Sequence, residues 1–369
     1  MQILISAFYF FYFAIVGIYV IFLPKVLSML GYSGVEIGIV FATAPLVRFL
    51  VPFAFIKGMK LNKKAFNSAL LIIVVSSVLF YAALHNFYAL VFTNILFGIG
   101  LSLLLPYVEV IALSVITKER YGKVRLFGSI GFIVVALVLV KYLSGVDIAV
   151  FYLIFMSVMT AIFGYLVAKN ESGESEDTDT SQSGNINIFS HWSLWAGLTL
   201  MQVSFGPFYN FFTIYETDHG IGMDMTIYLW SFGVVMEVFM LFFQGRLLQK
   251  NLLGILQFTT FMTALRWLLL FLFPQSLAVS FFTQSIHALS FALFHSAAIS
   301  YLFTLYKKRK LAQQFFLGIT YGLGGFTGAL YSGYVYEYFS TYLFLSSAFV
   351  AFTAFLFVRH EAKKTAYAS

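Results

Sequence analysis

Long apolar runs dominate this chain, and they constrain its fold more than any other feature. A helix needs about 20 predominantly apolar residues to cross the hydrocarbon core of a bilayer. A transmembrane β-barrel would instead show segments of about 10 residues with alternating polarity. The runs are longer and apolar on all sides, so they predict an all-α integral membrane protein with twelve transmembrane helices. The expected spans are residues 5–30, 36–57, 66–84, 87–116, 124–143, 148–168, 192–216, 224–244, 252–272, 276–306, 313–336 and 341–358.

The composition points the same way. Hydrophobic residues make up 61% of the 369 residues and charged residues only 10%, against about 25% charged in ordinary soluble domains. A soluble protein of this length could not bury so much apolar surface, which excludes a water-soluble enzyme and makes the lipid bilayer the expected surrounding. The chain has no cysteine, so disulfides and thiolate metal sites are excluded as well.

The distribution of basic residues predicts the orientation. The net charge of +7 would suggest nucleic acid in a soluble chain, but these residues lie between apolar runs, so no nucleic-acid partner is expected. With the N-terminus inside, 17 Lys and Arg fall on the inside and 2, Lys25 and Lys141, on the outside. Cytoplasmic loops carry such an excess, so both termini are predicted to be cytoplasmic, in a bacterial inner membrane. The 17 are Lys57, Lys60, Lys63, Lys64, Lys118, Arg120, Lys123, Lys169, Arg246, Lys250, Lys307, Lys308, Arg309, Lys310, Arg359, Lys363 and Lys364.

One polar segment divides the chain. Residues 169–190 are rich in Ser, Thr, Gly and Asn and carry five acids, which favours a solvated linker over a regulatory contact. The predicted units are an N-terminal six-helix bundle (1–168), this acidic cytoplasmic linker (169–190), a C-terminal six-helix bundle (191–358) and a cytoplasmic tail (359–369). Two pseudo-symmetric bundles of this kind form the major facilitator fold, and a monomer is expected. The five acids are Glu171, Glu174, Glu176, Asp177 and Asp179.

Charged residues inside the spans are candidate functional residues. Each costs roughly 2.5–3.5 kcal/mol at the centre of a membrane helix on the insertion scale. Glu109 and Arg125 lie symmetrically about the tip of the hairpin formed by spans 4 and 5, so they are predicted to face each other. They could clamp a hydroxylated or charged substrate, or could merely fix the hairpin. Arg48 in span 2 is a further candidate for the substrate site.

A second group of charges lies in spans 8, 9 and 10. Glu237 is near the middle of span 8, and a carboxylate there can take up and release a proton if a nearby cation is available to balance it. Arg266 is the expected cation and His287 the expected relay. The alternative interpretation is a static charge network that holds the three helices together.

Softer polar residues suggest a cavity between the bundles. In span 7, Gln202 and Tyr209 share one helix face with Thr213 and Glu216, because their spacings are 7, 4 and 3 residues. Gln284 lies on the same face of span 10 as His287, and Tyr12 is one of several tyrosines in span 1. Two acids nearer the outer ends, Glu216 and Glu337, are expected to see water. Small residues in span 11, Gly318/Gly322 and Gly324/Gly328, predict close helix packing.

Several short motifs resemble one family of transporters. PYVE at 106–109 followed by YGKVRLFGS at 121–129 resembles the span 4–5 region of lactose permease and its phenylpropionate permease-like relatives. SFGVVMEV at 231–238, Arg266-Trp267 and QSIH at 284–287 follow in the family's order. Arg48-Phe49 and the region around Gln202 resemble the phenylpropionate permease-like branch. The resemblance covers nearly the whole chain and implies the major facilitator fold.

The lactose permease resemblance also implies roles. Glu109 and Arg125 match the acid and base that hold the sugar, and Phe132 falls where that family stacks a tryptophan on the galactosyl ring. Glu237, Arg266 and His287 match its proton-coupling network. The chain departs from the pattern at Ser290, where the permease has a second carboxylate, and this departure puts proton coupling and galactoside specificity in question.

The interpretation that accounts for most of these features is a proton-coupled symporter of a small organic solute, with substrate, protons and lipid as partners. Arg48 and Arg125 favour an aromatic carboxylate, whereas the Glu109–Arg125 pair favours a sugar. The alternative is a proton-driven efflux antiporter for amphipathic compounds. A membrane-embedded enzyme is a third possibility, since His287 and His295 share a helix. The chain has no metalloprotease or nucleophile-elbow motif, so no enzyme activity, catalytic residue, metal or cofactor is expected.

Overall fold

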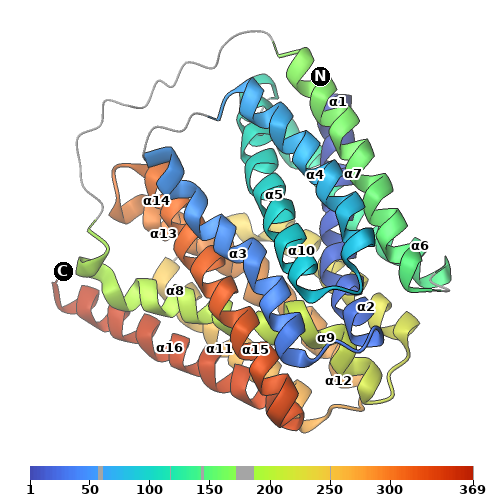
Figure 1. The fold of residues 1–369 in the computed structure, drawn as a ribbon. Coiled ribbons are helices and arrows are strands. Elements are labelled where there is room, and N and C mark those ends of the chain that lie inside the picture. Colours follow the sequence, from blue (N-terminus) through green and yellow to red (C-terminus); the bar gives the residue numbers. More distant parts are fainter. Residues whose placement is uncertain (57–60, 117, 143–144, 172–186, 250, 369) are drawn as a thin grey trace.

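A computed structural model describes residues 1–56, 61–116, 118–142, 145–171, 187–249 and 251–368 of the chain. Every regular element among these residues is helical (Figure 1). This confirms the all-α prediction. The expected linker acids Glu174, Glu176, Asp177 and Asp179 lie outside the described residues, so the linker and domain boundaries stay predictions.

The first six expected spans correspond to a set of helices that we call the N-terminal half. The first span is α1 (Gln2–Gly17), the π-helical segment η1 (Ile18–Phe22) and α2 (Leu23–Met29) in succession. The next five are α3 (Gly34–Ile56), α4 (Lys63–Ala83), α5 (Phe87–Val115), α6 (Lys118–Tyr142) and α7 (Val146–Lys169).

The remaining spans form the C-terminal half and are more often interrupted. The seventh span begins after η2 (Phe189–His191) and consists of α8 (Trp192–Ser204) and α9 (Gly206–Asp218). The eighth and ninth are α10 (Met223–Phe243), followed by η3 (Gln244–Arg246), and α11 (Leu252–Leu272). The tenth is α12 (Leu277–His287), η4 (Ala288–Leu293) and α13 (Phe294–Leu305). The last two are α14 (Arg309–Phe315), η5 (Phe316–Leu323) and α15 (Gly324–Phe339), then η6 (Ser340–Tyr342) and α16 (Leu343–Ala368).

Ten helical stretches among the described residues are long and apolar enough to cross a membrane. The tenth runs over Leu311–Thr365 and contains both of the last two expected spans. The seventh expected span is absent from the ten because it is broken into α8 and α9, which have 13 residues each. The described helices are therefore consistent with twelve crossings.

Polar residues at the helix ends explain where several spans begin. Asn62, Asn86 and Asn251 each accept a hydrogen bond from the backbone N–H three residues later, at 2.9–3.0 Å. Such side-chain caps satisfy donors that the first helical turn leaves unpaired. In the seventh span, Pro207 is the second residue of α9, after the break at Phe205, where the N–H that proline lacks has no partner within the helix.

The first and seventh spans end in the same way. Gly31 and Gly220 have φ angles of +87° and +89°, which glycine adopts readily. At each, the glycine N–H bonds to the carbonyl three residues back, and the next N–H bonds to the carbonyl five residues back. This is the Schellman motif. Its recurrence at equivalent places supports the pseudo-symmetry expected of the two halves.

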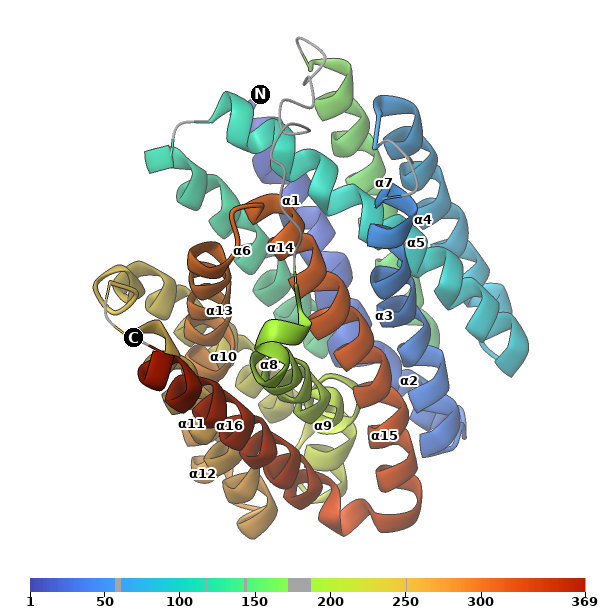
Figure 2. The ribbon, with the colours of Figure 1, turned by 90° about the vertical axis from the view of Figure 1, so that its left-hand side faces the viewer.

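Two pairs of helices form most of the contact between the halves. One pair is α6 with α10, and the other is α3 with η5 and α15. In Figures 1 and 2, α3 and α15 run side by side. A side chain at Gly322 would meet the backbone of Phe49, and one at Gly38 would meet that of Gly333. The small residues of span 11 therefore allow close packing, as predicted: Gly318 and Gly322 face span 2, whereas Gly324 and Gly328 face span 7.

The halves are also joined at the ends of the spans farthest from the linker, which we call the far end. The Lys25 Nζ donates to the Thr217 hydroxyl at 2.8 Å and lies 3.9 Å from the Asp218 carboxylate. The backbone N–H of Gly34 donates to the Glu337 carboxylate at 2.5 Å. Both contacts connect opposite halves.

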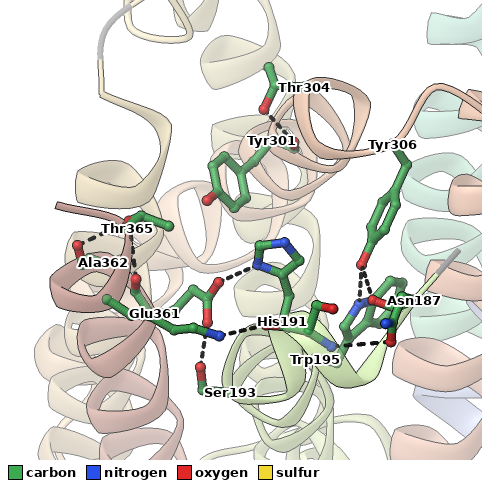
Figure 3. A network of polar contacts seen from close by, with 12 residues as sticks. Asn187, His191, Ser193, Trp195, Tyr301, Thr304, Tyr306, Glu361, Ala362 and Thr365 are labelled. Carbon is green, nitrogen blue, oxygen red and sulfur yellow. Dashed lines mark hydrogen bonds and ion pairs between the residues drawn. The ribbon is translucent and has the colours of Figure 1, made fainter. Parts of the chain in front are cut away.

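At the linker end, a polar network ties the start of α8 to α16 (Figure 3). The buried carboxylate of Glu361 accepts from the Ser193 hydroxyl at 2.5 Å, and the His191 Nδ1 lies 2.5 Å from its other oxygen. Lys364 donates to the Ser190 carbonyl at 2.6 Å. The chain that leaves the linker is thus held against the last helix.

Candidate functional site

The hairpin of α5 and α6 brings Glu109 and Arg125 together. The Arg125 Nε donates to the Glu109 Oε1 at 3.0 Å, and their side chains are 34% and 24% exposed. The two residues are symmetric about the hairpin tip, so the antiparallel helices place them at one depth. The geometry that their spacing predicts is therefore present. Its role in binding a solute stays a prediction.

Three aromatic residues that the motifs did not single out complete this pair. Tyr121 donates its hydroxyl to the other oxygen of Glu109. The Arg125 guanidinium lies 4.3 Å from the ring centre of Phe13 and 5.1 Å from that of Tyr9, within range of cation–π attraction. The sequence does carry a signal for Tyr121, because it precedes Arg125 by four residues and so lies on the same helix face.

Arg266 is the centre of a second polar cluster, formed by α11, α12 and η4. Its side chain is fully buried. Its Nη1 lies 3.0 Å from the His287 Nδ1 and 3.2 Å from the Ser290 hydroxyl, and its Nη2 donates to Gln284 at 3.1 Å. The position that lacks the family's second carboxylate, Ser290, is thus still a partner of the arginine. Because these acceptors are all neutral, the charge of Arg266 is not balanced by a carboxylate within this cluster.

Glu237 of α10 lies on the other side of His287. The His287 Nε2 is 4.0 Å from the Glu237 Oε2, and the Glu237 side chain is 19% exposed. An arginine can only donate, so the His287 Nδ1 must accept from Arg266. A neutral His287 therefore carries its proton on Nε2, the nitrogen that faces Glu237. The predicted triad of Glu237, His287 and Arg266 is assembled in that order.

Arg48 differs from the other two intramembrane arginines. Its side chain is exposed, and it forms no hydrogen bond or ion pair with any of the described residues. It nevertheless interacts electrostatically with Tyr12 of its own half and with Tyr209 and Tyr321 of the other. Arg48 therefore lies between the halves as an unpaired cation.

Tyr209 of α9 links these groups. Its ring stacks on Phe205 at a centroid distance of 5.4 Å, and its hydroxyl has no hydrogen-bond partner in the described part of the chain. It interacts electrostatically with Glu237 and Arg266 as well as Arg48. Arg125 likewise interacts with Glu237 across the halves. The two charged clusters thus form one central site.

The remaining predicted substrate-site residues, Tyr12, Phe132 and Gln202, are buried and contact other parts of the protein. The Tyr12 hydroxyl donates to the Leu101 carbonyl at 3.0 Å, so it is occupied within the N-terminal half. Phe132 is 9% exposed, and its ring centre lies 6.5 Å from that of Trp230, which places it in the α6–α10 contact between the halves. Gln202 is buried beside Gly324, and its Nε2 lacks a partner among the described residues.

His295 and Tyr321 form a polar pair that the sequence did not indicate. The His295 Nδ1 lies 2.7 Å from the Tyr321 hydroxyl, and His295 interacts electrostatically with Arg125. Tyr321 belongs to the π-helical η5, whose wider turns rotate side chains away from the faces that a regular helix gives them. No group of three or more His, Asp or Glu side chains within the described ranges could hold a metal ion.

Comparison with known proteins gives a consistent result. The family model described as MFS_1 like family matches residues 2–346. The chain is 25% identical to a probable 3-phenylpropionic acid transporter of Escherichia coli (strain K12), covering 95% of both chains. It is 24% identical to the uncharacterized transporter YwbF of Bacillus subtilis (strain 168), covering 90% of this chain and 87% of that one.

Solved structures show the same fold. A point mutant of the nucleoside transporter NupG superposes with a TM-score of 0.80 at 18% identity, covering 97% of this chain and 99% of the other. A bacterial homolog of the human lysosomal transporter Spinster superposes with a TM-score of 0.71 at 13% identity, covering 98% and 96%. These relatives and structural neighbours are transporters, which confirms the prediction of a transporter rather than an enzyme.

Proposed function

The chain belongs to the MFS_1 like family of membrane transporters, and from this premise we propose that it is a proton-coupled symporter of a small aromatic carboxylate. Major facilitator transporters bind their substrate near the midplane, between two bundles that rock around it. The central site described above lies between the two halves, which supports the proposal.

The unpaired Arg48 is the reason for proposing a substrate with a carboxylate group. Arg125 is paired with Glu109, and Arg266 already donates to three neutral acceptors. Arg48 has no such partner in the described residues, although it lies between the halves. A guanidinium matches a carboxylate with two parallel hydrogen bonds. A bound organic acid would neutralise the one central arginine that the described part of the protein leaves unpaired.

Tyr209, which interacts electrostatically with Arg48, suits the aromatic part of such a molecule. Its ring is backed by Phe205, on which it stacks, and by Phe208, at a centroid distance of 5.6 Å, and both of these rings are buried. An offset or edge-to-face contact between Tyr209 and a substrate ring would add about 0.5–1.5 kcal/mol. The relative named as a probable 3-phenylpropionic acid transporter makes 3-phenylpropionate the first solute to test.

Glu237 is the proposed coupling carboxylate. It faces His287 and interacts electrostatically with Arg125. A protonated Glu237 has no charge for Arg125 to attract, whereas an ionised one does. Proton loss at Glu237 and movement of the N-terminal half relative to α10 are therefore linked, which is the requirement for coupling.

The state described here supports an inward-facing assignment. The far end is closed by the contacts of Lys25 and Gly34. Among the described residues, α5 and α6 do not pack extensively against α13 or α14 at the linker end. With the termini and linker in the cytoplasm, as the basic residues suggest, the central site would communicate with the cell interior.

Uptake into proteoliposomes tests this function. Under an acid-outside pH gradient, labelled 3-phenylpropionate should accumulate, and a protonophore should abolish the accumulation. Arg48→Gln should raise KM roughly tenfold to a hundredfold, since a hydrogen bond to a charged group contributes about 1.5–3 kcal/mol. Arg246→Gln, outside the central site, is the matched control and should transport like the parent.

Other outcomes would contradict parts of the proposal. If 3-phenylpropionate and related acids are ignored while a galactoside accumulates, the Glu109–Arg125 pair recognises a sugar and the role of Arg48 is wrong. If an amphipathic compound is expelled against the proton gradient, the transporter is an efflux antiporter.

A further inference from the structure

A second carboxylate, Glu216, lies in the C-terminal half away from the central site. The sequence placed it near the outer end of its span, where it was expected to see water. The structure shows the opposite, because Glu216 near the end of α9 is fully buried. The expectation was wrong because Ser280 of α12 lies against the carboxylate and the side chain is covered, which the position of Glu216 along its own helix does not reveal.

Among the described residues, the Glu216 carboxylate has one polar partner. The Ser280 hydroxyl of α12 lies 3.2 Å from one of its oxygens and 3.4 Å from the other. No cation lies within ion-pair distance of it among the described residues. An isolated ionised carboxylate is very unfavourable in an apolar interior, and such a group becomes neutral instead. The geometry therefore favours a Glu216 that holds a proton.

The surrounding charged groups do not change this conclusion. On its own helix, Tyr215 is a neighbour and Asp218 lies toward the end, and His219 directly after the helix contacts Tyr215 with its ring and lies 2.8 Å from the Tyr215 carbonyl. From the elements packed against α9, Lys25 of α2 reaches Thr217 and Asp218 rather than Glu216. The remaining groups nearby at the far end are Asp224 in the first turn of α10, Tyr336, which donates to Asp218, and Glu337, which accepts from Gly34.

One face of α12 connects Glu216 with the central site. Ser280, Gln284 and His287 follow at intervals of four and three residues, so they lie along one face. Ser280 contacts Glu216, and His287 faces Glu237. Gln284 between them lies against Gly233, which precedes Glu237 by one turn of α10.

A buried polar atom lies along the same route. The Nε2 of Gln284 is buried without a hydrogen-bond partner in the part of the chain that the structure describes. Such groups are commonly satisfied by internal water. A proton can move between Glu216 and Glu237 only through groups of this kind, because the two carboxylates are not in contact.

We infer that Glu216 is a second proton-binding site, connected with Glu237 through Ser280, Gln284 and His287. In the state described here it is sealed from the far side, where Lys25 binds the adjacent Thr217 and Asp218. When the far end opens, Lys25 leaves and Glu216 becomes the first buried carboxyl that a proton from that side meets, beyond the exposed carboxylates of Asp218, Asp224 and Glu337. This inference rests on the proposed proton coupling, but it concerns a group outside the substrate site.

Infrared spectroscopy of the purified full-length protein in lipid tests the site without any transported solute. A protonated carboxylic acid has a C=O stretching band that an ionised carboxylate lacks. In a Glu237→Gln background, this band should be present at neutral pH and should disappear when Glu216→Gln is added. Ser280→Ala, which removes the hydrogen bond but keeps the carboxyl, should shift the band. Asp224→Asn, an exposed carboxylate in the same half, should leave it unchanged.

The pH titration of the band tests the connection. In the parent protein, the pH at which the Glu216 band is lost should differ from that in Glu237→Gln, since two linked sites titrate together. If Glu216→Gln leaves the band intensity unchanged, Glu216 is ionised and the inference falls. If the band belongs to Glu216 but titrates identically with and without Glu237, the connection is wrong. Neither result depends on uptake, so failure of the proposed symport remains a separate outcome.

Discussion

The three arginines inside the spans have three different environments. Arg125 is paired with a carboxylate and covered by aromatic rings, and Arg266 is fully buried among neutral acceptors. Arg48 is exposed between the halves and has no partner among the described residues. Buried charges are stable only when they are paired or hydrogen-bonded, so the unpaired arginine is the one available for an anionic solute. Each residue's part in transport can be tested by changing its charge alone.

Glu237→Gln should separate exchange from accumulation. The amide keeps the shape of a protonated glutamate but cannot lose a proton. The variant should therefore exchange labelled for unlabelled 3-phenylpropionate across proteoliposome membranes at a rate close to that of the parent. Accumulation driven by a pH gradient should be lost. If the variant still accumulated the solute, Glu237 would not be the coupling group, and His287 would be the next residue to test.

Neutralising either member of the Glu109–Arg125 pair should weaken substrate binding. Arg125→Gln leaves the Glu109 carboxylate with Tyr121 alone, and Glu109→Gln removes the anionic partner of Arg125. Each variant leaves the remaining charge of the pair without its partner beside the central site, so we expect the affinity for the substrate to fall about tenfold. Ligand-dependent thermal shifts would measure this. Unchanged binding in Arg125→Gln would show that the pair only fixes the hairpin.

At the scale of helices, packing depends on positions where two backbones come close. Gly131 of α6 faces the Phe10 carbonyl of α1, and a Cβ added there would overlap that oxygen. Gly122 of the same helix has open space around its Cβ position. The π-helical segments η1, η4 and η5 interrupt other spans. Such segments within α-helices are frequent at functional sites.

Gly131→Ala should destabilise the N-terminal half, whereas Gly122→Ala should not. The backbone of Phe10 cannot move aside as a flexible side chain could, so α1 and α6 must separate. Overpacking of this kind costs about 1–3 kcal/mol, and the melting temperature in detergent should fall measurably. Gly122→Ala should melt at the parent temperature or slightly above it, since alanine favours the helix. Equal melting temperatures in the two variants would contradict the close approach of α1 and α6.

At the scale of the whole molecule, contacts at the far end hold the two halves in the closed arrangement there. Lys25 and Asp218 are 22% and 46% exposed at their side chains, so their attraction is a surface interaction worth about 0.2–1 kcal/mol. A contact of that size can be broken in each cycle. A much stronger one would trap a single state.

Lys25→Gln should increase the population that is open at the far end. Loss of the attraction of about 0.2–1 kcal/mol between Lys25 and Asp218 corresponds to an increase of roughly 1.4- to 5-fold. The chain has no cysteine, so spin labels can be attached at Met29→Cys and Met225→Cys, two exposed methionines at the far ends of opposite halves. The distribution of distances between the labels should broaden toward longer values. Lys141→Gln in the same label background is the control, since Lys141 lies outside the Lys25–Asp218 contact. A distribution identical to the parent's would show that Lys25 does not stabilise the closed end.

The distribution of basic residues makes a separate prediction about the whole molecule. With 17 of the 22 Lys and Arg on one side, both termini should be cytoplasmic. Tags at the two termini should be inaccessible to a protease added outside intact cells and accessible after the cells are lysed. A C-terminal tag cleaved in intact cells would contradict the expected orientation.

The sequence alone was sufficient for the fold and for the charged residues of the two clusters, although not for the aromatic residues around Arg125. Apolar runs of membrane length leave helices as the main way to satisfy backbone groups in lipid, so the architecture follows from patterning. Charges within such runs are rare because they are unfavourable there, and each therefore stands out. The spacing of Glu109 and Arg125 even predicted their pairing, since a hairpin of two regular helices has simple geometry.

Tertiary structure decided how these residues are partnered. Glu216 was expected to face water at the outer end of its span, but its side chain is buried and lies against Ser280 of α12. Arg48 could be identified as unpaired only once the partners of Arg125 and Arg266 were known. The pairing of His295 with Tyr321 depends on π-helical turns that displace side chains from the regular helix face. Along one span, periodicity tells which residues share a face, but what covers that face is set by helices far away in the chain, through packing that no local pattern records.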